Sequence, residues 1–174
     1  MIDLHLMVIS YPSRRESLFE AMTLHFAKLV TDDFQVERCQ DGEDVLDVAQ
    51  RLTKRHHRLQ TLDLFGHGAG GRFWLGDSML FASDGTGYGL AKKLGGQLAP
   101  DGALRLLGCR TALVSRDFGD NSIRSSGPKL LRDLTRLLGR QRMAWGSTAY
   151  LGPRDLGPAG FSARTESRFV KARV

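Results

Sequence analysis

Short apolar runs alternate along this chain with segments of helical periodicity. Four runs are mostly apolar and predict strands at residues 4–10, 61–66, 103–108 and 143–147. Residues 34–39 alternate between apolar and polar side chains and predict a further strand. Apolar positions three or four residues apart predict helices over residues 18–29, 42–52, 86–99 and 128–139. Strands that alternate with helices predict a single α/β domain over residues 1–174, with a mostly parallel central sheet.

Local signals predict where several of these elements begin and turn. Ser13 lies three residues before Glu16, which is typical of a capping box, so we expect Ser13 to be the N-cap of the first helix. Gly76-Asp77 divides the apolar stretch 72–81 and predicts a small hairpin. Pro100-Asp101-Gly102 predicts a turn, and the mostly polar residues 110–127 predict a loop.

Two of the predicted strands end in the same way. The run 61–66 leads into His67-Gly68, and the run 103–108 leads into Cys109. Open parallel sheets bind their ligands at the carboxyl edge of the strands, and a thiol beside an imidazole is a common nucleophile and base. We therefore predict a catalytic dyad in which Cys109 is the nucleophile and His67 the acid and base. The N–H groups of Gly68 and Cys109 are the candidates for an oxyanion hole.

Each of these residues also has a simpler interpretation. A single cysteine at a strand end is most often a small buried apolar side chain, and a histidine beside glycines is most often part of a turn. The prediction rests on the two strand ends taken together.

The two strand ends resemble the caspase-like cysteine peptidases. The strings FGHGAGG and LLGCRTA are most similar to bacterial caspase-like domains, and the likeness covers roughly residues 3–150. The resemblance implies a caspase-like three-layer α/β/α sandwich and an endopeptidase that acts on a protein substrate with the Cys109/His67 dyad. A catalytically silent caspase-like domain with a binding or regulatory role is the alternative.

The resemblance also implies a pocket that reads a charged residue before the scissile bond, the P1 residue. Matching regions hold Arg14, Arg15 and Arg154, which would favour an acidic P1 residue. Asp63, Asp117 or Asp120 could instead line a pocket for a basic one. Because caspases mature by cuts in the loop after the nucleophile, self-cleavage within residues 116–124 is a further hypothesis.

Composition narrows the partners. The net charge is +6, but the basic residues are dispersed among acidic ones, so we expect no specific nucleic-acid site. No apolar run approaches the about 18 residues of a membrane helix, and the first residues do not resemble a signal peptide, so we expect a cytoplasmic protein. Two cysteines and no metal-ligand spacing predict neither a disulfide framework, a metal site nor a cofactor. The oligomeric state stays open.

Two other enzyme or binding classes compete for the His67-Gly68 string. In an α/β-hydrolase, Gly68 would occupy the place of the nucleophilic serine, and the chain has no other G-x-S-x-G elbow. A flavodoxin-like binding domain would need a Gly-rich phosphate loop after the first strand, which the chain lacks. Both are weaker than the peptidase interpretation.

Overall fold

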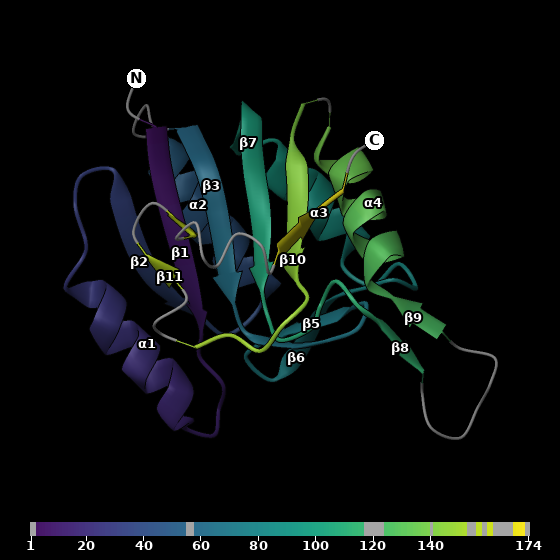
Figure 1. The fold of residues 1–174 in the computed structure, drawn as a ribbon. Helices are drawn as coiled ribbons and strands as arrows, with labels where there is room; N and C mark the ends of the chain where they lie inside the picture. The colour runs from purple at the N-terminus through teal and green to yellow at the C-terminus, as the bar shows by residue number, and fades with distance from the viewer. Residues whose placement is uncertain are drawn as a thin grey trace.

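The computed structural model describes residues 3–54, 58–116, 124–139, 141–152, 156–157, 160–161 and 169–172. Its centre is a six-stranded sheet with the strand order β13-β10-β7-β3-β1-β2 (Figure 1). These strands are β1 (Asp3–Ser10), β2 (Phe34–Cys39), β3 (Arg58–Phe65), β7 (Leu98–Leu107), β10 (Met143–Ser147) and β13 (Phe169–Lys171). Neighbouring strands run parallel, except that β13 is antiparallel to β10. The predicted α/β class and mostly parallel sheet are confirmed.

Helices pack on both faces of this sheet. They are α1 (Ser17–Ala27), α2 (Gly42–Thr53), α3 (Tyr88–Gly95) and α4 (Gly127–Leu138). One hydrophobic cluster joins α2, α3 and α4 to one face, and a second joins α1 to the other (Figure 1). Since successive side chains of a strand point to opposite faces, β1 supplies Leu6 and Val8 to the first cluster and Met7 and Ile9 to the second. This layering is compatible with a three-layer α/β/α sandwich.

The start of the first helix differs from the prediction. The N-cap of α1 is Glu16, not Ser13, and no side chain caps it. The Ser13 N–H instead donates to Asp77, at a distance of 3.0 Å. The capping-box prediction was wrong because Ser13 bonds to this distant turn at Gly76-Asp77 and not to the first turn of α1.

The region between residues 86 and 108 also differs from the prediction. The helix α3 ends at Gly95, and β7 begins at Leu98, several residues before the predicted strand. Leu59 pairs with Leu98 and Thr61 with Ala103, so the residues between Leu98 and Ala103 bulge out of the ladder. The predicted turn at Pro100-Asp101-Gly102 is therefore a bulge within one long strand, because β3 pairs with the residues on both sides of it.

Smaller sheets lie outside the main sheet. β4 (His67–Ala69), β5 (Arg72–Leu75) and β6 (Ser78–Ala82) form a three-stranded antiparallel sheet, which confirms the predicted hairpin. Where we expected only loop after Cys109, β8 (Val114–Arg116) pairs with β9 (Arg124–Ser126). β11 (Leu156–Gly157) pairs with β12 (Gly160–Phe161) in the region after β10.

Candidate active site

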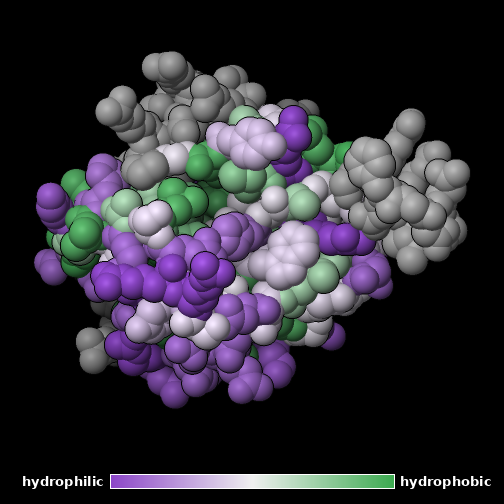
Figure 2. Space-filling view, turned by 90° about the horizontal axis from the view of Figure 1, so that it is seen from below, coloured by the Kyte–Doolittle hydropathy of each residue, from purple (hydrophilic) through white to green (hydrophobic). Residues whose placement is uncertain are grey.

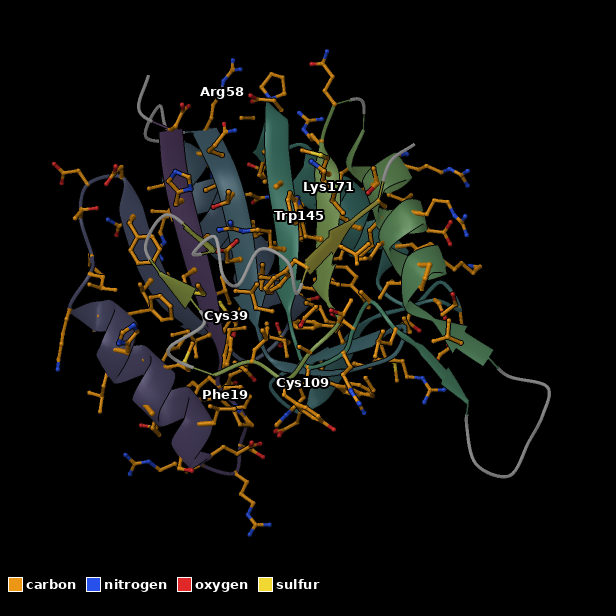
Figure 3. All side chains as sticks on the ribbon, viewed as in Figure 1. Phe19, Cys39, Arg58, Cys109, Trp145 and Lys171 are labelled. Atoms are coloured by element: carbon orange, nitrogen blue, oxygen red, sulfur yellow. The ribbon has the colours of Figure 1, made fainter. Side chains whose placement is uncertain are left out.

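The two strands that carry the predicted dyad are neighbours at the centre of the sheet. β3 and β7 are parallel, and their last residues, Phe65 and Leu107, are paired and buried. The chain leaves β3 through Gly66 to His67 and leaves β7 through Gly108 to Cys109. Figure 3 places Cys109 at the lower end of β7, at the same end of the molecule as Phe19 and at the opposite end from Arg58. The structure thus brings the two predicted catalytic residues to one edge of the sheet.

Two glycines allow the strand ends to touch. A Cβ added at Gly68 would lie 2.7 Å from the carbonyl carbon of Gly108 and 2.8 Å from the carbonyl oxygen of Cys109. A Cβ added at Gly108 would lie 3.0 Å from the Cα of Gly68. Any larger residue at either position would push the His67 and Cys109 backbones apart. The close approach predicted for Gly68 is confirmed, whereas its role in an oxyanion hole stays a prediction.

The turn that follows Cys109 is held from several sides. Arg110 has a left-handed backbone with φ of 58°, and its N–H donates to the Ala149 carbonyl at 3.1 Å. The buried Thr111 hydroxyl donates to the Gly108 carbonyl at 3.3 Å and accepts from the Ser147 N–H at 3.0 Å. These bonds tie the segment that presents Cys109 to the end of β10. Positive φ at a residue other than glycine is a strained conformation that tends to occur at functional sites.

Cys109 itself is half-buried. In the described part of the chain, its backbone N–H has no hydrogen-bond acceptor, and its thiol makes no hydrogen bond to His67. A free N–H beside the thiol is what an oxyanion site requires. Catalytic hydrogen bonds are often long in free enzymes and tighten when substrate binds, so the lack of a thiol–imidazole hydrogen bond does not exclude a dyad.

His67 has a partner that the sequence did not reveal. Its Nε2 lies 2.8 Å and 3.1 Å from the two carboxylate oxygens of Glu16, which belongs to the loop between β1 and α1. The ring also packs edge-on against Phe19, with ring centroids 5.0 Å apart. The position of Glu16 in the loop after the first strand is the signal that the sequence offers, but the capping-box pattern gives this residue a different role.

The second cysteine has a different environment. Cys39 is fully buried at the end of β2, and burial, together with the negative charges of Asp44, Glu37 and Asp41, raises the pKa of its thiol to about 12. Because the thiolate is the reactive form and Cys39 is inaccessible to solvent, Cys39 is not a candidate nucleophile.

We expect iodoacetamide to modify Cys109 in the native protein at neutral pH and to leave Cys39 unmodified. The reason is that Cys39 is both buried and protonated, whereas Cys109 is half-buried at the sheet edge. Intact mass and peptide mapping after a short exposure would measure this, and modification of both thiols in denaturant would serve as the control. Native modification of Cys39 at the rate of Cys109 would contradict the assignment.

The residues predicted to bind the P1 side chain differ in where the structure places them. Arg14 and Arg15 lie exposed in the same loop as Glu16, and Arg15 donates to Glu20 at 3.2 Å. Asp63 cannot line a pocket for a basic P1 residue, because it is buried and ion-paired with Arg105. That alternative was therefore wrong for Asp63. Arg154, Asp117, Asp120 and most of the proposed self-cleavage loop lie outside the described residues.

Figure 2 looks onto the carboxyl edge. It shows hydrophobic side chains among hydrophilic ones in the upper half of the view, and mostly hydrophilic side chains in the lower half.

Within the described ranges, no group of three or more histidine, cysteine, aspartate or glutamate residues could hold a metal ion. None of the described helices has both the length and the apolar character needed to cross a membrane.

Comparison with known proteins supplies a family. No curated protein matches the chain, and no solved structure matches it. A family model with the description "Domain of unknown function (DUF4347)" matches residues 18–157, a range that includes both His67 and Cys109. Because this match covers more than half of the chain, the chain belongs to the DUF4347 family.

Proposed function

We propose that this protein is a caspase-like cysteine endopeptidase that cleaves a protein substrate after a charged P1 residue. The observation that carries the proposal is the direct contact between the glycines beside His67 and Cys109, at the ends of two adjacent central strands. A base and a thiol placed together at the carboxyl edge of a parallel sheet are the two groups that nucleophilic acyl transfer needs. The cytoplasmic location and the bacterial origin expected from the sequence belong to this proposal.

The reaction uses these residues in two stages. The His67 imidazole takes the Cys109 proton, and the thiolate attacks the scissile carbonyl carbon to form a tetrahedral intermediate. The Cys109 N–H, with Gly68 as the second candidate donor, stabilises the oxyanion. His67 then gives its proton to the leaving amine as the C–N bond breaks, which leaves a thioester. Water, deprotonated by His67, cleaves the thioester and returns the thiol.

The charge of the P1 residue follows from which side chains line the pocket. Arg14 and Arg15 remain candidates for an acidic P1 residue because both are exposed in a loop that reaches His67 through Glu16. Arg154 completes the set expected from the sequence. Asp117 and Asp120 remain the candidates for a basic one.

A peptide library and a covalent probe test the proposal. We expect cleavage of peptides with a charged P1 residue, and we expect an acyloxymethyl ketone peptide to add one equivalent of mass at Cys109. The Cys109→Ala variant should not be labelled, whereas Cys39→Ala should be labelled like wild type. Neither cleavage nor labelling in the wild-type protein would overturn the proposal and favour the catalytically silent domain. A library profile after Arg or Lys would exclude the acidic P1 pocket.

A further inference from the structure

We propose that Glu16 is a positioning residue that holds the His67 imidazole in the tautomer able to take the Cys109 proton. This inference rests on the proposed peptidase function. Both carboxylate oxygens of Glu16 approach the same ring nitrogen, Nε2, at 2.8 Å and 3.1 Å. Among the described residues, the Glu16 side chain has no other hydrogen-bond or ion-pair partner.

The local backbone directs Glu16 toward the ring. Glu16 is the last extended residue before α1, with φ of −121° and ψ of 127°. An N-cap side chain usually turns back to bond the first helical N–H groups, but the Glu16 side chain makes no such bond. The carboxylate is therefore available to cross to a residue 51 positions later in the chain.

The first turn of α1 also holds the ring from a second direction. Phe19 is fully buried and packs edge-on against His67, with ring centroids 5.0 Å apart. It packs in the same way against Phe65, the last residue of β3, at 5.9 Å. Phe19 thus connects the end of β3 to the ring that follows it. A carboxylate and an aromatic wall from the same helix end limit where the imidazole can lie.

The chemistry of this pair follows from the donor and acceptor capacities of its groups. A neutral imidazole carries one N–H and one lone pair, and an ionised carboxylate can only accept. A carboxylate at Nε2 therefore favours the tautomer with the proton on Nε2, which leaves the Nδ1 lone pair for the thiol proton. When that proton arrives, the negative charge of Glu16 stabilises the imidazolium, as the third member of a catalytic triad does.

Solvent limits the size of the effect. The His67 side chain is 51% exposed and that of Glu16 is 37% exposed, so water screens the pair. A buried triad carboxylate contributes about ten-thousandfold to turnover. For this exposed pair we expect a loss of only about tenfold, below the range for the acid or base itself.

Kinetics of Glu16→Gln, Glu16→Asp and the control Glu20→Gln would test the inference. Glu20 is a carboxylate at the start of α1 that pairs with Arg15 and Arg38 and not with His67. On the best peptide from the library, Glu16→Gln should lower kcat about tenfold with little change in KM, because it affects proton transfer and not substrate binding. Glu16→Asp should restore part of the loss, and Glu20→Gln should keep the wild-type kcat, because Glu20 does not contact His67. An unchanged kcat, or a change confined to KM, would overturn the inference.

A spectroscopic measurement separates this inference from the proposed function. Long-range ¹H–¹⁵N spectra report the tautomer of each histidine, and the His67→Gln variant would identify the His67 signals among those of the five histidines. We expect the Nε2–H tautomer in wild type and in Glu20→Gln. We expect a mixture in Glu16→Gln, because an amide can either donate or accept. If the wild-type protein cleaves no peptide, the proposed function fails, while an identical tautomer in Glu16→Gln and wild type would refute the role of Glu16 by itself.

Discussion

Replacing Cys109 with alanine is expected to lower peptidase turnover by more than about a thousandfold, because the nucleophile and its base act as a unit. The structure supports so large an effect because Cys109 is half-buried at the end of the strand next to the one that leads to His67, while Cys39 is fully buried. The measurement is kcat on the best library peptide for wild type and Cys109→Ala. The same loss is expected for His67→Ala, because the thiol then has no adjacent base.

The matched control is Cys39→Ala. This substitution removes the other thiol from the protein but touches no residue of the candidate site, so turnover should stay near the wild-type value. Thermal unfolding of all three variants would show that they are folded. Peptidase activity that survives in Cys109→Ala would place the nucleophile elsewhere and refute the proposed dyad.

Arg105→Met is expected to lower the free energy of unfolding by about 3–5 kcal/mol, because it leaves a buried carboxylate without its counter-charge. Arg105 is 7% exposed and Asp63 is 2% exposed, and the guanidinium donates to both carboxylate oxygens. The two residues are paired across β3 and β7, two positions before Phe65 and Leu107. The ion pair therefore links the two strands that lead to His67 and Cys109. Urea unfolding would measure the change.

An exposed ion pair provides the comparison. Arg51 pairs with Glu37, and their side chains are 53% and 32% exposed, so Arg51→Met should cost less than about 1 kcal/mol. The double variant Asp63→Leu/Arg105→Met should recover most of the stability that the single variant loses, because no unpaired charge then remains buried. A loss in Arg105→Met no larger than that in Arg51→Met would contradict this account.

Several features of the fold were predictable because they depend on short segments. The strands β1, β3 and β10 follow from short, mostly apolar runs, which parallel strands covered on both faces require. The strand β2 follows from the alternation of apolar and polar residues over 34–39. Helix α4 was predictable from its apolar spacing, with Pro128 near its start and Gly139 after its end. The limits of α3 and β7 were not, since pairing with β3 decides where β7 begins.

In the candidate site, too, some residues could be identified from local sequence patterns, while others depend on long-range contacts. His67 and Cys109 could be identified because a buried strand that stops at a glycine beside a reactive side chain is a local pattern. Glu16 could not be assigned, because its contact with His67 joins residues 51 positions apart and depends on how the loop after β1 folds over the sheet edge. The sequence also could not exclude Asp63 from the P1 pocket, because its pairing with Arg105 depends on β3 and β7 being neighbours.

The sequence by itself determined the class of the fold, the two strands that end at a histidine and a cysteine, and the glycines that let those ends come close. These properties follow from apolar periodicity and from the small size of glycine, which act within a few residues. Only the tertiary structure decided that β3 and β7 are neighbours, that Glu16 contacts His67 and that Asp63 forms an ion pair with Arg105 within the sheet. Those contacts arise from strand order and side-chain burial, which depend on segments far apart along the chain.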